Sequence, residues 1–208
     1  LPRFIFLNMM DKEKAHFNEA LHAIEKGCNI LPVCLTVPMG AEHHLSGVID
    51  LLNMKALKFA ADKSGKVQEM EIPAEFVDEA KAQREKLIEA IVETDEKLMS
   101  DYLEGKEISF DQLLPLLKQG IAQHKLTPVF AGSAALNIGV TPLIKAICDF
   151  FPAPNVRKPE WSGLMDDMKT EGNRSSSVDV PFSAFVFKTS VDHFAGKVNF
   201  CRIVSGKL

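Results

Sequence analysis

Short, largely apolar runs recur along the chain, and each ends in small or polar residues. They cover residues 1–7, 30–37 and 127–131. None has the strict alternation of a strand with one face in water, and runs of this kind are typical of strands buried on both faces of a parallel sheet. We therefore expect a parallel sheet assembled from three separated segments.

Between the first two runs, apolar residues follow a helical spacing. Phe17, Ala20, Leu21 and Ile24 lie at i, i+3, i+4 and i+7, and Gly27 is placed to end the helix. Strand, helix and strand in this order predict a βαβ unit with a right-handed crossover. The chain also opens inside its first strand without an initiator Met, so we expect it to be a piece of a larger protein.

The pattern changes between residues 41 and 125. Residues 48–59 are rich in apolar and β-forming types, and a turn signal at residues 62–65 predicts that residues 67–72 pair back as a hairpin. Pro73 introduces a charged helical tract. Ser109 and Gln112 form a capping box for a further helix, which Pro115 should bend. These features predict an inserted α+β subdomain.

The last eighty or so residues divide into a helix, a connector and strands. Thr141 is predicted as the N-cap of a helix with Pro142 in its first turn. Residues 155–180 have the Gly, Ser and mixed charge of a connector. Alternation then returns at residues 182–188 and 198–204, which predicts two antiparallel strands at the start of a β-domain.

Composition narrows the functional classes. The 208 residues are 46% hydrophobic and 25% charged, with a net charge of −4, which argues against sequence-independent binding to nucleic acid. No apolar run approaches the about 20 residues of a membrane helix, so no membrane partner is expected. The four cysteines form no CxxC pair and are predicted to be reduced and mostly buried. No metal site is predicted, and His43 and His44 are expected to be a surface pair.

Candidate chemistry lies after the first and third apolar runs. Asp11 follows the first run, where a carboxylate can accept bonds from N1–H and the 2-amino group of guanine, whereas adenine presents an acceptor there. Asn8 carries both a donor and an acceptor for the base or for a neighbouring loop. Gly132, Ser133 and Ala134 follow the third run, and such small residues let backbone N–H groups approach a ligand. A plain turn explains either feature taken alone.

These motifs, taken together, resemble those of the translational GTPases. Residues 8–11 resemble the guanine-specificity motif N-K-x-D, with Met9 in place of Lys, and residues 132–134 resemble the later G-S-A motif. Further segments resemble the elongation factor G family in collinear order, namely residues 37–40, 46–51, 137–140, 151–154, 181–184 and 202–206.

The resemblance implies a fold class and a domain order. The fold would be α/β: a partial P-loop-type GTPase sheet with an inserted α+β subdomain, followed by the first strands of an antiparallel β-barrel. Residues 1–40 and 126–154 would form the C-terminal half of the GTPase domain, and residues 41–125 the inserted subdomain. Residues 155–180 would be the linker, and residues 181–208 the truncated start of the second domain.

The resemblance also implies a function. The parent would be a cytoplasmic, ribosome-dependent GTPase that drives translocation of tRNA and mRNA. Asn8, Met9, Asp11, Ser133 and Ala134 would bind the guanine base of GTP or GDP. The chain contains no G-x-x-x-x-G-K-[ST] phosphate loop and no predicted catalytic residue. Mg²⁺ and the phosphates would be held by parts outside this chain, so the chain alone is expected not to hydrolyse GTP.

Partners and alternatives remain open at this level. Residues 71–107 contain twelve acidic and five basic residues, which fits either a solvated helical face or a protein-docking surface. The docking candidates are Glu75, Glu79, Glu89 and Glu93, and the resemblance points to the ribosomal stalk protein. Truncated barrel strands could pair with a second copy. Alternatives for the parent are a release-factor or ribosomal-protection type of factor, and a ribosome-binding module without nucleotide binding.

Overall fold

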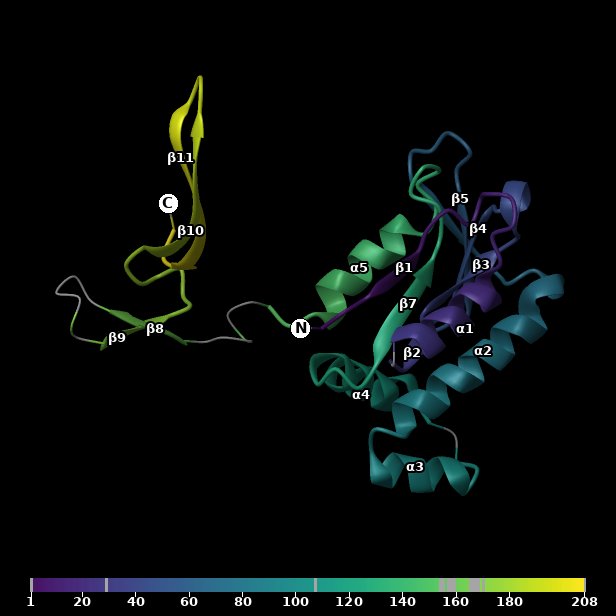
Figure 1. Ribbon diagram of the computed structural model, residues 1–208. Helices are drawn as coiled ribbons and strands as arrows, with labels where there is room; N and C mark the ends of the chain where they lie inside the picture. Colours follow the sequence, from purple (N-terminus) through teal and green to yellow (C-terminus); the bar gives the residue numbers. More distant parts are fainter. Residues whose placement is uncertain are drawn as a thin grey trace. The chain divides into compact units, whose positions relative to one another are not determined.

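The chain divides into two compact units, residues 1–151 and residues 152–208. A computed structural model (Figure 1) describes residues 2–28, 30–106, 108–153, 156, 160–164, 169 and 171–207. It is a mixed α/β structure in which a parallel sheet and antiparallel sheets coexist.

The parallel sheet of the first unit has the strand order β1-β7-β2. Its strands are β1 (Ile5–Leu7), β7 (Thr127–Ala131) and β2 (Pro32–Cys34), so the three apolar runs do form one parallel sheet. Every residue of the central strand β7 is buried. Helices α1 (Phe17–Cys28) and α5 (Val140–Phe150) lie on opposite sides of this sheet (Figure 1).

The pattern of residues 30–37 predicts one strand, and this is wrong. The run divides at Leu35 between two sheets. The backbone N–H of Leu35 donates to Val129 O at 2.9 Å, and its carbonyl accepts from Leu51 N at 3.0 Å. The chain then enters an antiparallel sheet of order β3-β4-β5-β6. Its strands are β3 (Thr36–Met39), β4 (Gly47–Asp50), β5 (Lys55–Phe59) and β6 (Val67–Met70).

Helices α2 (Ala74–Val92), α3 (Glu96–Leu103) and α4 (Phe110–Ala122) follow this sheet. Arg84 of α2 donates to the carbonyl oxygens of Leu51 and Leu52, which ties the helix to the turn after β4. The capping box of Ser109 and Gln112 is confirmed, and Pro115 lies inside α4. Helix α4 packs against α2, and both contribute buried residues to one hydrophobic core.

The predicted N-cap of α5 is wrong, because the helix is capped by Gly139 instead of Thr141. Gly139 has φ +79°, and a Cβ at this position would lie 2.3 Å from Ala131 O. Only glycine fits such a close approach at a positive φ. The Thr141 hydroxyl is thus available for another contact, and it donates to Gly65 O at 3.4 Å.

The second unit contains two hairpins. Strands β10 (Ser183–Asp192) and β11 (Gly196–Ser205) confirm the predicted antiparallel pair and extend it. The connector composition of residues 155–180 did not predict the other hairpin, β8 (Glu160–Leu164) with β9 (Glu171–Ser175). The Trp161 ring of β8 lies 5.1 Å from the Arg202 guanidinium of β11, so a cation–π contact helps to hold the hairpins together.

The prediction that the cysteines are mostly buried is wrong. Cys34 is buried in β2, and burial raises the pKa of its thiol to about 12. Cys28 is the last residue of α1, Cys148 lies on α5 and Cys201 on β11, and all three are exposed. Among the described residues, no group of three or more His, Cys, Asp or Glu is placed to hold a metal ion. No helix in the described part of the chain is long and apolar enough to span a membrane.

The contact of α4 with α2 can be tested at Leu117, which is fully buried in α4. We expect Leu117→Ala to lower the free energy of unfolding by about 2–5 kcal/mol, because the lost methyl groups leave a cavity. The adjacent Lys118 is exposed, so Lys118→Ala should change it by less than about 0.5 kcal/mol. Helices α1 to α5 all belong to the first unit, so urea denaturation followed by far-ultraviolet circular dichroism measures the difference. Equal effects of the two substitutions would contradict this packing.

Candidate functional site

The loops after β1 (residues 8–16) and β7 (residues 132–139) meet at one rim of the parallel sheet. We call them the base loops, because the sequence predicts that they hold a guanine base. Strand β1 pairs with β7 in parallel register, so their carboxyl ends are neighbours. Ala134 N donates to Asn8 Oδ1 at 2.9 Å, and Met10 N donates to Gly132 O at 3.1 Å. Residues separated by more than 120 positions in sequence are thereby fixed within hydrogen-bonding distance. The structure thus brings together Asn8, Asp11, Ser133 and Ala134, as the sequence predicts.

Asp11 is the most unusual group at this rim, because it is a carboxylate with only 7% of its surface exposed. Its Oδ2 lies 3.1 Å from Lys12 Nζ. Its Oδ1 is the one buried side-chain oxygen or nitrogen without a hydrogen-bond partner among the described residues. Buried acceptors are nearly always satisfied, and an unsatisfied one is costly. The arrangement suits a ligand that donates to Asp11.

Hydrogen bonding from the Ser133 side chain is the largest influence on Asp11, and it lowers the pKa of the carboxyl. Burial acts in the opposite direction, and Lys12 adds to the lowering. Ser133 is itself fully buried. The carboxyl is therefore held in its ionised form, which is the form that accepts two parallel hydrogen bonds.

The loop after β7 is too tight for larger residues. Ser133 and Ile138 exchange two backbone hydrogen bonds of 3.0 and 2.9 Å. A Cβ on Gly132 would lie 2.2 Å from Ile138 O. The Ser133 hydroxyl accepts from Leu136 N at 3.3 Å. This tight return explains why small residues follow β7 and keeps the Ala134 amide close to Asn8.

Met9 lies on the outer side of its loop, with 60% of its surface exposed and φ +64°. Asn8 Oδ1 accepts from Met9 N at 2.8 Å, which stabilises this left-handed backbone. Beside the loop lies a cavity of about 380 Å³, whose lining includes Asn8, Met10 and Lys14. A long apolar side chain in this position could cover one face of a flat ligand.

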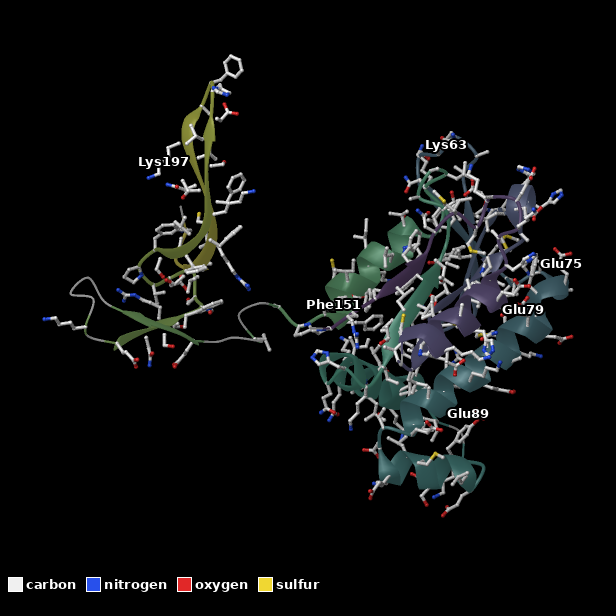
Figure 2. The ribbon with its side chains drawn as sticks, in the orientation of Figure 1. Lys63, Glu75, Glu79, Glu89, Phe151 and Lys197 are labelled. Atoms are coloured by element: carbon white, nitrogen blue, oxygen red, sulfur yellow. The ribbon has the colours of Figure 1, made fainter. Side chains whose placement is uncertain are left out.

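The predicted docking residues lie elsewhere in the first unit. Glu75, Glu79 and Glu89 are distributed along α2 (Figure 2), and Glu93 is its C-terminal cap. All four are exposed, and their spacing places them on one face of the helix. Lys86 falls on the same face. None of the four approaches the base loops through a hydrogen bond or ion pair that the described residues show.

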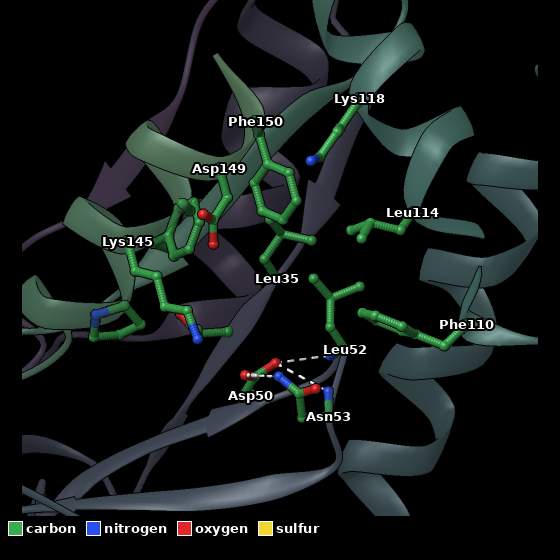
Figure 3. Close-up of a pocket in the computed structure, with 14 residues that line it drawn as sticks. Leu35, Asp50, Leu52, Asn53, Phe110, Leu114, Lys118, Lys145, Asp149 and Phe150 are labelled. Atoms are coloured by element: carbon green, nitrogen blue, oxygen red, sulfur yellow. Dashed lines mark hydrogen bonds between the residues drawn. The ribbon is translucent and has the colours of Figure 1, made fainter. Parts of the chain in front are cut away.

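A further cavity, of about 400 Å³, lies between α4 and α5 and contains none of the predicted site residues. Figure 3 shows Phe110, Leu114 and Lys118 of α4 on one side and Lys145 and Asp149 of α5 on the other. Asp50 closes one end, where its carboxylate accepts from Leu52 N, Asn53 N and Asn53 Nδ2. The cavity is therefore separate from the rim that carries Asp11.

Sequence reasoning missed two residues that support the base loops. Glu42 accepts a hydrogen bond from Lys14 N, and Asn137 donates one to Lys63 O. Both residues have a positive φ. Asn137 follows the small-residue loop closely, so its tolerance of left-handed backbone was a usable signal. Glu42 carries no comparable signal, because glutamate is common at exposed positions in any loop.

Comparison with known proteins identifies the wider family. Elongation factor G from Mycoplasma pneumoniae is 37% identical over 211 aligned residues, which cover all of this chain and 30% of the relative. The chain is a homologue of part of elongation factor G. A crystal structure of a protein from Thermus thermophilus matches with a TM-score of 0.77 and 28% identity, over all of this chain and 28% of that one. No protein-family model matches.

The similarity to elongation factor G covers both base loops. The chain spans about 30% of the length of this relative, so it carries part of what a whole elongation factor G contains. Within the 208 residues there is no G-x-x-x-x-G-K-[ST] sequence. The residues present fit the base of a guanine nucleotide, because Asp11 offers an unsatisfied ionised acceptor, and they do not include a phosphate loop.

The link between Ser133 and Asp11 can be tested by titration. A carboxyl whose folded pKa is below its ordinary value of 3.8 stabilises the fold above that value, and this stability is lost as pH falls through the folded pKa. We expect Ser133→Ala to raise the pKa of Asp11 toward its ordinary value. The stability that ionised Asp11 contributes would then be smaller. Carbon-detected NMR titration of the carboxyl groups measures the change. Asp192, whose pKa is lowered by the amides of Ala195 and Phe194, should not respond; an unchanged Asp11 would disprove the link.

Proposed function

We propose that this chain is a segment of a ribosome-dependent translation elongation GTPase of the elongation factor G type, and that its own task is to recognise the guanine base of GTP or GDP. One observation carries the proposal: the buried, ionised Asp11 has an oxygen without a partner, at the rim where two loops meet. The similarity to elongation factor G over the whole chain supports it.

Base recognition follows from the donors and acceptors at this rim. The Asp11 carboxylate accepts from N1–H and the 2-amino group of guanine. Ser133 and Ala134 form the small-residue side of the site, and their own N–H groups are bonded to Ile138 O and Asn8 Oδ1. Adenine has no hydrogen at N1 and no 2-amino group, so it would leave the buried carboxylate unpaired. Asn8 braces the two loops through its bond with Ala134, and Met9 covers one face of the base.

The remaining parts of the proposal concern the whole protein. The parallel sheet would be the C-terminal part of a P-loop-type GTPase sheet, residues 41–125 its inserted subdomain, and β10 with β11 the first strands of a barrel. Their open edges could also pair with a second copy. Phosphates, Mg²⁺ and hydrolysis would belong to segments outside this chain, since it contains no phosphate loop. The partner is the ribosome, and the compartment is the cytoplasm.

Met9 supports a second candidate. A lysine at this position would add a charge near the nucleotide, whereas the exposed thioether of Met9 adds none. In a divergent relative the nucleotide site could have been lost, leaving a ribosome-binding module. A sibling translational GTPase of the release-factor or ribosomal-protection type is the other alternative. The affinity of the full-length protein for GDP separates the binding module from the GTPases.

Asp11→Asn in the full-length protein tests base recognition. The amide can still accept from N1–H, but its NH₂ group faces the 2-amino group of guanine as donor against donor. We expect GDP affinity to fall by at least about tenfold and affinity for xanthosine diphosphate, which carries an oxygen there, to rise. Titration with fluorescent nucleotide analogues measures both.

Asp111→Asn is the matched control, because Asp111 is exposed on α4. It should leave both affinities unchanged. If the wild-type protein binds the ribosome but neither GDP nor GTP, the binding-module candidate replaces the GTPase. If Asp11→Asn loses GDP without gaining xanthosine diphosphate, Asp11 does not contact the 2-position of the base.

We also propose that the acidic face of α2 docks a partner protein, and that this partner is the ribosomal stalk protein. Glu75, Glu79, Glu89 and Glu93 share one exposed face, interrupted only by Lys86, and a surface of this charge attracts a basic partner. Nucleic acid is disfavoured, because its phosphates carry the same sign of charge.

Charge reversal tests this docking face. The double variant Glu79→Lys with Glu89→Lys should bind purified stalk protein roughly tenfold more weakly, mainly through a slower association rate. The difference should shrink as salt rises, because the interaction is screened. A second double variant, Glu69→Lys with Glu171→Lys, has the same net charge and alters exposed residues elsewhere. Equal losses in both variants would mean that only net charge matters.

A further inference from the structure

Strained backbone is concentrated around the two base loops. Seven described residues other than glycine have a positive φ, and five of them lie in these loops or against them: Met9, Lys14, Glu42, Lys63 and Asn137. Such conformations persist only where the surrounding structure enforces them, and they cluster at functional sites. Asn8 supports Met9 from within its own loop, and further contacts come from the connections of the inserted antiparallel sheet.

Glu42 is the first of these contacts. It opens the short 3₁₀ helix Glu42–His44 in the connection between β3 and β4. Its backbone N–H donates to Met10 O at 3.1 Å, and its Oε1 accepts from Lys14 N at 2.8 Å. Glu42 therefore holds both ends of the segment that contains Asp11.

The turn between β5 and β6 is the second contact. Asn137 Nδ2 donates to Lys63 O at 3.3 Å, and Thr141 Oγ1 donates to Gly65 O at 3.4 Å. Lys63 marks this turn in Figure 2. A Cβ on Gly65 would lie 2.6 Å from Asn137 Nδ2, so the turn is packed directly against that side chain. Asn137 N in turn donates to Ala134 O at 3.2 Å, which carries the contact to the base loop.

Sheet topology explains why both contacts reach the same rim. In an antiparallel sheet of order β3-β4-β5-β6, the connections β3–β4 and β5–β6 emerge at one end and the connection β4–β5 at the other. The first two connections carry Glu42 and the Lys63 turn. The strands thus present one end of the insert to the loop after β1 and to the loop after β7 together.

From this geometry we infer that the inserted sheet sets the positions of both base loops, with Glu42 and Asn137 as positioning residues for guanine selectivity. The positioning of the loops follows from the contacts above, whereas the effect on guanine selectivity rests on the proposed function. Loss of either contact frees one loop to move relative to the other. The position of Asp11 relative to the loop after β7 then varies, and so does the fit of guanine between the two loops.

Two substitutions remove these contacts with little change of shape. Asn137→Asp keeps a side chain that tolerates a positive φ but replaces the donor to Lys63 O with an acceptor. Glu42→Ala removes the acceptor for Lys14 N, and Glu42→Gln restores one. Asn18→Asp on α1 and Glu69→Ala on β6 are controls at exposed positions. The unfolding free energy of each variant is measured alongside.

Amide hydrogen exchange in the 208-residue chain is the first readout. Asn137→Asp and Glu42→Ala should speed exchange at the amides of Ala134 and Met10, which join the two loops, while Glu42→Gln and the controls should match the wild type. Unchanged exchange at both amides would overturn the inference by itself, without reference to any nucleotide.

The ratio of GDP to inosine diphosphate affinity in the full-length protein is the second readout, because inosine lacks only the 2-amino group. Both disruptive variants should lower this ratio by about two- to tenfold, with rescue in Glu42→Gln. If both affinities fall equally, the two residues have a purely structural role, and the inference is overturned. If the wild type binds no GDP while exchange responds as expected, the positioning stands and the proposed function fails.

Discussion

The parallel pairing of β1 with β7 is the constraint on which the rest of this structure depends. Strand β1 has only three residues, yet its register with β7 decides which two loops become neighbours. A shift by one residue would move Asn8 away from Ala134 and would turn the alternate faces of the strand over. The bond between Asn8 Oδ1 and Ala134 N then converts the pairing of strands into a fixed geometry of side chains.

The energetic cost of this arrangement is concentrated at Asp11. Burying an ionised carboxylate is unfavourable by several kcal/mol unless it is compensated. Here the Ser133 side chain and Lys12 compensate, and the pKa of Asp11 is lowered although burial acts to raise it. One oxygen still lacks a partner. A buried acceptor without a partner lowers stability, and a ligand that donates to this oxygen would satisfy it.

Much of the fold could be predicted from the sequence, for identifiable reasons. The strand runs and the capping box at Ser109 depend on local patterns, which a linear sequence records directly. The division at Leu35 could not be predicted, because it depends on Val129 and Leu51, which are distant in sequence. The cap at Gly139 depends on the approach of Ala131 O. At the site, Asn8, Asp11 and Ser133 stand out as motif residues, whereas Glu42 acts only through the partners that folding brings to it.

The same reasoning joins the base loops to the insert. Three-residue strands such as β1 and β2 offer few hydrogen bonds, so the loops that follow them need support from elsewhere if a buried charge and left-handed backbone are to persist. Glu42 and the turn at Lys63 provide that support from a sheet that the sequence places between the two loops. The insert is therefore not an appendage to the parallel sheet. Because it contacts both loops at once, we expect any movement of the insert to change how the loops lie relative to each other and, under the proposed function, to change the affinity for the base.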